Sequence, residues 1–184
     1  MLEFAAVAKA QITQSLLTAM LEQAGYHVHR FGIEERLLEI KYLDAARYAQ
    51  LALAPRLRTL PDLLISASDL SVAYLIEVKF RARLRPGDMR ALQTTLRQQF
   101  DHWPGLFVVL FLGESFWDGR GYVQDHVRVL RASDLDAFAD ERVEMARRWE
   151  ALPMLHHAVA GLTFENYHGH ADRITDLVRI LAAI

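Results

Sequence analysis

The sequence PDLLISASDLSVAYLIEVKF, residues Pro61 to Phe80, contains two apolar runs joined by a short polar segment. The runs are Asp62 to Ala67 and Val72 to Phe80. The Ser and Asp side chains of segment 68–71 are suited to hydrogen-bond a tight reversal of the chain. The stretch therefore predicts a β-hairpin near the middle of the protein.

The segments on either side of this hairpin alternate between helical and strand-like patterns. Helices are expected over 6–24, 35–53, 88–100, 133–149 and 172–183, and strands over 26–31, 62–67, 72–80, 106–112 and 122–130. Within 35–53 the alternation from Glu39 to Tyr42 leaves a strand open as the alternative, and Asp88 is expected to cap the helix that follows it. This order predicts an α/β fold with a mixed central sheet flanked by helices.

Length and composition are those of one folded domain spanning 1–184. The chain has 184 residues, of which 52% are hydrophobic and 24% charged, and it contains no cysteine. Disulfides and thiolate zinc sites are therefore excluded. The longest strongly apolar run, Gly105 to Gly113, is too short to cross a bilayer, so we expect a cytoplasmic protein without a membrane partner.

Charge is nearly balanced overall but uneven along the chain. The net charge is −2, which excludes a polycation that coats nucleic acid nonspecifically. Between Lys79 and Phe100, however, six residues are positive and one is negative. This basic run is typical of either a solvated face or a phosphate-binding surface. In the second case, four of its arginines are the expected contacts to nucleic-acid phosphates: Arg81, Arg83, Arg90 and Arg97. The acidic segment from Asp134 to Glu144 would repel DNA and is expected away from an active cleft.

Two carboxylates and a lysine stand out in the hairpin. Because side chains alternate across a strand, Glu77 and Lys79 share one face while Val78 points to the other. Asp62 and Glu77 are about equally far from the turn, so their Cβ atoms would be roughly 5 Å apart if directly opposed. Two such carboxylates repel each other unless a cation lies between them, and Mg²⁺ is the natural candidate. Mn²⁺ is expected to substitute for it.

Pro61-Asp62 followed by Glu77-Val78-Lys79 resembles the motif of the PD-(D/E)XK nuclease superfamily, the restriction-endonuclease-like and Holliday-junction-resolvase-like fold. The resemblance spans 6–112 and implies an α-β-β-β-α-β core if 35–53 is an insertion. Residues 113–184 would then add a C-terminal strand and helices. A Glu-x-Lys sequence alone is weak evidence, since Glu39-Ile40-Lys41 is a second instance.

The resemblance also implies roles for individual residues. Asp62, Glu77 and the carbonyl of Val78 would bind the metal ion, and Lys79 would help to activate water. Such enzymes often carry a further acid upstream, for which Glu34 is the first candidate and Glu35 and Glu22 compete. A glutamine on the following helix recurs in some branches of the superfamily. Gln93 is the candidate for that place, with Gln98 as its alternative.

Together these features predict a Mg²⁺-dependent nuclease that hydrolyses phosphodiester bonds, with DNA as the expected substrate. The alternative is a catalytically inactive nuclease-fold protein that serves in binding or assembly. Cutting two strands would suit a two-fold homodimer. In the plainest interpretation, Asp62 only ends a loop, and Glu77 with Lys79 forms the charged face of an edge strand. Histidines 156, 157, 168 and 170 are interpreted as surface or turn residues rather than metal ligands.

Overall fold

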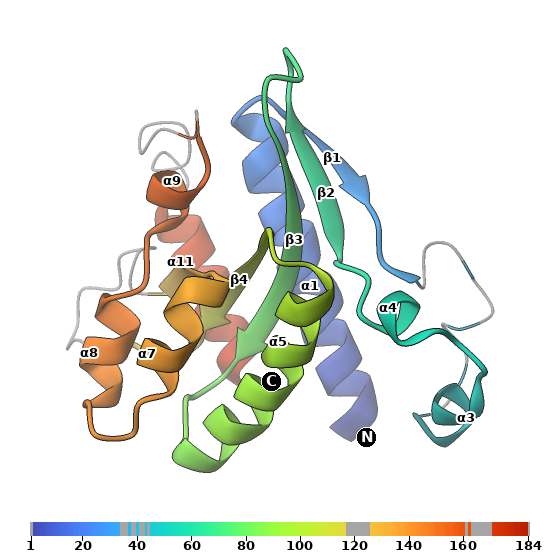
Figure 1. Ribbon diagram of the computed structural model, residues 1–184. Coiled ribbons are helices and arrows are strands. Elements are labelled where there is room, and N and C mark those ends of the chain that lie inside the picture. The colour runs from blue at the N-terminus through green and yellow to red at the C-terminus, as the bar shows by residue number, and fades with distance from the viewer. Residues whose placement is uncertain are drawn as a thin grey trace.

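A five-stranded mixed sheet forms the centre of the computed structural model (Figure 1). The structure describes residues 2–33, 37, 40, 43, 45–116, 126–160, 162 and 171–183. The strands, which follow chain order across the sheet, are β1 (Tyr26–Arg30), β2 (Leu63–Ala67), β3 (Ala73–Arg81), β4 (Leu106–Leu112) and β5 (Val127–Leu130). Strands β3 and β4 are parallel, and every other neighbouring pair is antiparallel.

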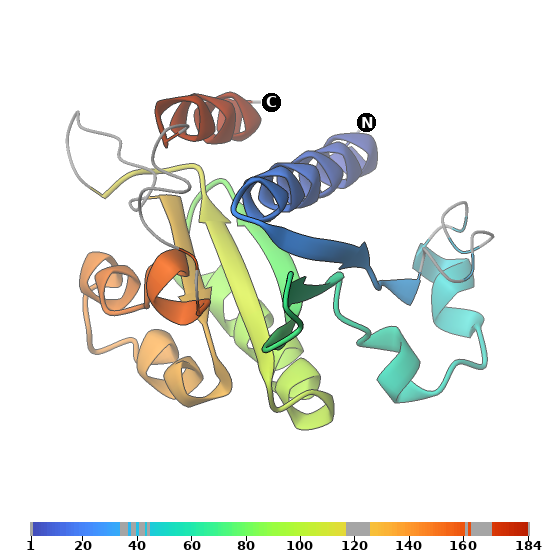
Figure 2. The same cartoon turned by 90° about the horizontal axis from the view of Figure 1, so that it is seen from above.

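Helices cover both faces of this sheet, which confirms the predicted α/β fold with a mixed sheet flanked by helices (Figures 1 and 2). One face carries α1 (Leu2–Gln23), α9 (Leu155–Ala158) and α11 (Ala171–Ala183), and the other carries α5 (Pro86–His102), α7 (Leu135–Ala139) and α8 (Met145–Glu150). Shorter elements are α3 (Ala45–Gln50), α4 (Pro55–Arg58) and the 3₁₀ turn η2 (Ala132–Asp134). Within the described ranges, no helix has both the length and the apolar character that crossing a membrane requires.

Strand β4 shows how the sheet separates two hydrophobic clusters. All of its residues except Phe107 are buried. Val109 and Phe111 pack toward α1, whereas Val108 and Leu110 pack toward α5. A continuous apolar run is what a strand covered on both faces needs.

The predicted helix over 35–53 is wrong for its C-terminal part. In the described residues, α3 ends at Gln50 and the next three residues are not helical. The guanidinium of Arg58 donates to the carbonyls of Tyr48 and Ala49, at 3.2 and 3.3 Å, and so satisfies groups that a continuing helix would have used. The alternative strand from Glu39 to Tyr42 lies largely outside the described residues.

The start of α5 and the segment expected as a helix over 133–149 also differ from the prediction. Helix α5 begins at Pro86 with Arg85 as its N-cap, so Asp88 lies inside the helix instead of capping it. Proline is favoured in the first helical turn because its missing N–H would have no partner there. The helix expected over 133–149 is divided into η2, α7 and α8, because Asp140 accepts a hydrogen bond from the N–H of Arg142 at 3.0 Å and forms a turn.

Helix α11 packs tightly against the end of β4 at Gly113. A Cβ atom built on Gly113 would lie 2.4 Å from the Cβ of Ala182 and 3.2 Å from the carbonyl oxygen of Ala82. Only glycine fits this approach without moving α11. The contact joins the C-terminal helix to the carboxyl ends of β3 and β4.

Candidate functional site

The hairpin brings Asp62, Glu77 and Lys79 to the same place. Its antiparallel register pairs Leu63 with Ile76, and one more step of that register sets Asp62 opposite Glu77. Ile76 and Val78 pack in the cluster under α1. Because side chains alternate along a strand, Glu77 and Lys79 point to the opposite face, the face that α5 covers.

A backbone hydrogen bond fixes the carboxylate of Asp62 against β3. The N–H of Val78 donates to Oδ2 of Asp62 over 2.7 Å. Strand β2 begins only at Leu63, so the side chain of Asp62 accepts a hydrogen bond that a longer β2 would have accepted with a carbonyl. The N–H and C=O of one strand residue point to the same edge, so the carbonyl of Val78 also points toward the Asp62 side.

Glu77 is a buried acid, and among the described residues only one of its two carboxylate oxygens has a hydrogen-bond partner. Its residue is only 4% exposed. Its Oε1 accepts from Nζ of Lys79, whose side chain is 25% exposed and lies at the rim of the site. Its Oε2 is buried and has no hydrogen-bond partner among the described residues. Burying a carboxylate oxygen without a partner costs free energy, and a missing ion is one of the standard reasons for finding one.

The chain leaving β1 is anchored to the same position. The carbonyl oxygen of Asp62 accepts hydrogen bonds from the N–H groups of Phe31, at 2.8 Å, and Gly32, at 3.3 Å. Glu34, the candidate third acid, follows two residues later and lies outside the described residues, as does Glu35. Glu22 belongs to α1, on the other face of the sheet, and is not brought to the site.

These residues fit a hard divalent cation. Oxygen ligands are what Mg²⁺ prefers, and Asp62, Glu77 and the Val78 carbonyl offer three of them. The buried Oε2 of Glu77, which has no partner in the described part of the chain, is the observation that supports the fit. No group of three or more histidine and acidic side chains that could hold a metal occurs within the part of the chain that the structure describes. Asp62 and Glu77 are the two candidate side-chain ligands in the described ranges, and the proposed third, Glu34, lies outside them.

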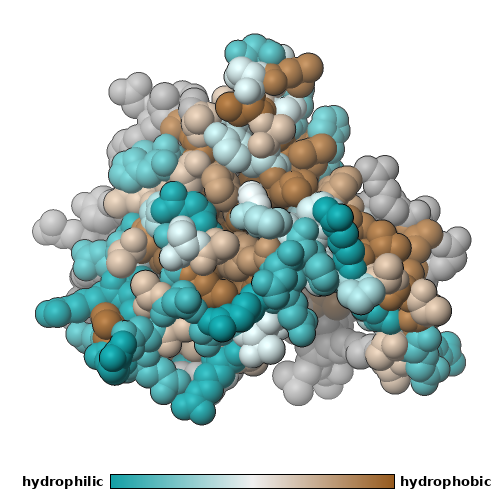
Figure 3. Space-filling model, in the orientation of Figure 1, coloured by the Kyte–Doolittle hydropathy of each residue, from teal (hydrophilic) through white to brown (hydrophobic). Residues whose placement is uncertain are grey.

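The four arginines predicted to contact phosphates fall into two pairs. On α5, Nε of Arg90 lies 2.8 Å from Oε1 of Glu141, and Nη2 of Arg97 lies 2.5 Å from Oδ1 of Asp136. The guanidinium of Arg90 also lowers the pKa of the Glu141 carboxyl below its ordinary value. The acidic segment is thus held along α5, where hydrophilic side chains cover the surface (Figure 3).

The other two predicted arginines lie closer to the acids. Arg81 is the next residue after Lys79 on the same face of β3 and donates from Nη1 to the carbonyl of Phe80 at 2.8 Å. Arg83 is exposed in the connection between β3 and α5.

The buried glutamine of α5 is neither of the two predicted candidates. Gln93 is half-buried and lines a shallow hollow on α5 together with Arg97, on the side that faces α7. Gln98, its alternative, is exposed. Gln99 is 5% exposed, and its Oε1 is buried with no partner among the described residues.

Gln99 lies on the side of α5 nearer Asp62. One turn further along α5, His102 makes a 2.9 Å contact through Nδ1 with Oγ1 of Thr59, three residues before Asp62. The sequence could have indicated that Gln99 is buried, because it occupies an apolar position of α5, three residues after Leu96 and seven after Leu92.

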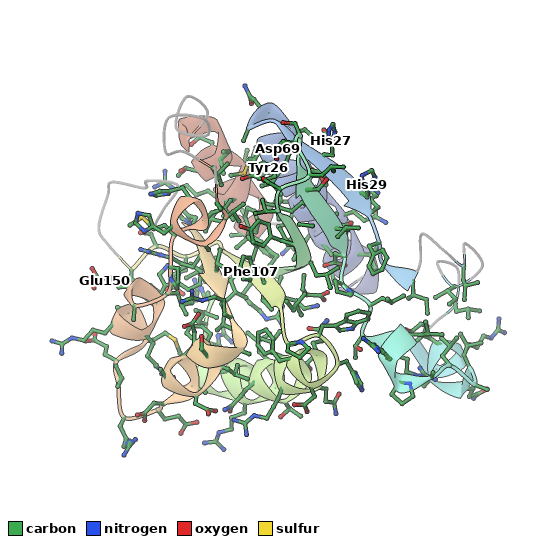
Figure 4. The ribbon with its side chains drawn as sticks, turned by 45° about the horizontal axis from the view of Figure 1, so that its top comes forward. Tyr26, His27, His29, Asp69, Phe107 and Glu150 are labelled. Carbon is green, nitrogen blue, oxygen red and sulfur yellow. The ribbon has the colours of Figure 1, made fainter. Side chains whose placement is uncertain are left out.

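The histidines form no comparable centre in the described ranges. His27 and His29 are exposed on one face of β1 (Figure 4). The rings of His156 and His157 meet edge to face with centroids 4.1 Å apart. His168 and His170 lie outside the described residues.

The arrangement at Asp62, Glu77 and Lys79 can bind a cation with two carboxylates and hold an ammonium group beside it. Comparison with known proteins finds no matching family model, curated protein or solved structure. A functional proposal for this chain therefore depends on the chemistry of the site itself.

Proposed function

We propose that the protein is a divalent-cation-dependent nuclease that hydrolyses phosphodiester bonds of nucleic acid, with DNA as its substrate. The observation that carries the proposal is the pairing of Asp62 with Glu77. One carboxylate is fixed by the N–H of Val78, and the other is buried with no partner for its Oε2 among the residues that the structure describes. Although Oε1 is paired with Lys79, a buried carboxylate oxygen without a partner costs free energy, and a bound cation would remove that cost.

Each residue has a role that its position allows. Asp62 and Glu77 would hold Mg²⁺, or Mn²⁺ in its place, together with the Val78 carbonyl, and Glu34 would add a further acid. When bound, the ion supplies Lewis-acid stabilisation of the phosphate charge and lowers the pKa of water. Lys79, held beside Glu77, orients the attacking water and balances the negative charge that develops on the phosphate.

The reaction is an in-line hydrolysis. The water oxygen forms a bond to phosphorus while the bond from phosphorus to the leaving oxygen breaks. The water loses a proton, and the leaving oxygen gains one. The protein's part in this step is to position the groups and to stabilise charge.

The order of elements supports the same proposal. From the N-terminus it runs α1, β1, β2, β3, α5 and β4, with the short helices α3 and α4 inserted between β1 and β2. This agrees with the α-β-β-β-α-β order of the PD-(D/E)XK superfamily that the motif resembles. Asp62 precedes β2, and Glu77 and Lys79 lie on β3, where that motif places its acids and lysine.

A cleavage assay tests the proposal. Purified protein is incubated with Mg²⁺ or Mn²⁺ and end-labelled single-stranded, duplex and branched DNA. We expect cleavage of at least one substrate, its loss on chelation with EDTA, and a fall of at least a hundredfold in the Asp62→Asn and Glu77→Gln variants. Thermal melting of each variant shows that it is folded.

Asp69→Asn is the matched control. Asp69 lies on the turn of the same hairpin, is exposed, and accepts a hydrogen bond from the N–H of Ser71 that asparagine can also accept. It should cut at the wild-type rate. The proposal fails if the wild type cuts none of the substrates, or if Glu77→Gln cuts as fast as the wild type.

A second candidate function is binding or assembly by a nuclease-like fold that does not cut. The observation that favours it is a set of exposed apolar side chains on the two helices that pack together behind the sheet: Val7 and Ile12 of α1, and Leu177 and Ile180 of α11. Exposed apolar residues on adjacent helices are typical of docking surfaces. In that case Mg²⁺ should leave the melting temperature of the protein unchanged.

A further inference from the structure

A groove lined by arginines lies at the carboxyl end of β3. Its walls come from the connection between β3 and α5, from α5 itself and from α11. The lining residues are Arg81, Ala82, Arg83, Arg85, Ala91 and Ala182. None of the described side chains that line it is acidic. The groove is therefore a positively charged surface on a protein whose net charge is −2.

Two of these arginines are available to a ligand. Arg83 and Arg85 are exposed, and neither forms an ion pair within the described part of the chain. Arg90 and Arg97 on α5 differ, because each is already paired with a carboxylate of the acidic segment. A phosphate would have to displace those carboxylates to reach the arginines of α5.

The groove lies further along the chain from the proposed active site, toward the carboxyl end of β3. Glu77, Lys79 and Arg81 occupy alternate positions on one face of β3, and the chain then runs on to Arg83 and Arg85. A chain of six residues spans at most about 21 Å, so Arg85 lies within that distance of Lys79. One strand of duplex DNA advances about 3.4 Å along its axis per phosphate, so the groove lies within roughly six nucleotides of a phosphate held at Lys79.

We infer that the groove of Arg81, Arg83 and Arg85 binds the phosphate backbone of a nucleic-acid strand on one side of the bond that is cut. The inference rests on the proposed function, because that function places the reacting phosphate at Lys79. Arg83 and Arg85 are the principal contacts, since guanidinium groups match phosphate oxygens in pairs of hydrogen bonds. Arg90 and Arg97 instead hold the acidic segment against α5.

Salt-dependent binding tests this division of the arginines. Binding of fluorescently labelled 20-base-pair DNA is measured by anisotropy in EDTA, where no cation-dependent cleavage takes place, over a range of NaCl concentrations. The variants are Arg83→Gln with Arg85→Gln, and Arg90→Gln with Arg97→Gln as the matched control. Both double variants remove two positive charges, so they change the net charge equally.

The groove variant should bind at least tenfold more weakly at low salt. The slope of log affinity against log salt should fall by about 1.8, because each phosphate contact contributes about 0.9. The control should keep the wild-type slope and lower the melting temperature instead. The inference is overturned if the wild type does not bind DNA, if the two double variants lose affinity equally, or if polyglutamate competes as well as unlabelled DNA.

Measuring DNA binding and DNA cleavage together distinguishes a failure of this inference from a failure of the proposed function. If the wild type cuts DNA but the groove variant binds like the wild type, the groove is wrongly assigned and the nuclease proposal stands. If the groove variant loses binding while the wild type never cuts, the groove binds nucleic acid and the nuclease proposal fails.

Discussion

Replacing Asp62 separates its structural role from its proposed role as a ligand. Asp62→Ala removes both the carboxylate and the acceptor of the Val78 N–H, whereas Asp62→Asn removes the charge and keeps an oxygen that can accept that hydrogen bond. The two variants should therefore differ in stability and agree in their response to a divalent cation. Asp69→Asn, on the exposed turn of the same hairpin, is the control for loss of a carboxylate.

The expected stability changes follow from the hydrogen bond. A hydrogen bond to a charged group contributes about 1.5–3 kcal/mol, and the low end applies here because Asp62 is only partly buried. Asp62→Ala should therefore lose about 1.5 kcal/mol of unfolding free energy, which lowers the melting temperature by roughly 3–6 °C in a protein of this size. Asp62→Asn should melt within about 2 °C of the wild type, because it keeps the acceptor.

The response to Mg²⁺ is measured by thermal melting with and without the ion, at ionic strength matched with NaCl. A ligand at a hundred times its Kd stabilises the folded state by about 2.7 kcal/mol, which corresponds to roughly 5–11 °C. The wild type and Asp69→Asn should show this rise, and neither Asp62 variant should. A full rise in Asp62→Asn would refute the claim that this carboxylate binds the cation, and an unchanged melting temperature in Asp62→Ala would refute the importance of its hydrogen bond.

Three further predictions concern positions outside the hairpin. Gly113→Ala should lower the melting temperature by roughly 4–8 °C, because its Cβ would meet Ala182 at 2.4 Å and overpacking costs about 2 kcal/mol; an unchanged value would mean that α11 moves away freely. Hydrogen bonds from Arg142 lower the pKa of Asp140 to about 2 from its ordinary 3.8, so the ionised acid stabilises the folded state above pH 4, and that contribution is lost as the pH falls toward 2. Asp140→Asn should flatten the decline of melting temperature over this pH range, and an identical decline in the variant would contradict the assignment. Gln99→Leu should raise the melting temperature, because Oε1 of Gln99 is buried and has no partner in the ranges that the structure describes, and a fall would show that the amide is satisfied in solution.

Short-range patterns predicted the centre of the fold. The alternation along β3 placed Glu77 and Lys79 on one face, and the polar turn at 68–71 fixed the register that sets Asp62 opposite Glu77. Both features depend on a period of two and on a turn length, which are properties of neighbouring residues. The hydrogen bond from the Val78 N–H to Asp62 is the structural detail that this register produces.

Contacts between distant segments were not predictable in the same way. Arg90 and Glu141 are 51 residues apart, and nothing near either residue in the sequence indicates that they meet. The division of the arginines into paired and available ones depends on where α7 packs against α5, which only the folded chain determines. Gln99 is an intermediate case, because its apolar position on α5 was visible in the sequence, but the lack of a partner for its Oε1 among the described residues was not.

The most direct test of the central claim is an anomalous difference map from crystals of the protein grown with Mn²⁺. We expect a peak within about 2.5 Å of carboxylate oxygens from both Asp62 and Glu77, at the buried Oε2 of Glu77 for which the described residues provide no partner. A map with no peak beside these two residues, in crystals whose Mn²⁺ concentration supports cleavage or thermal stabilisation, would contradict the claim.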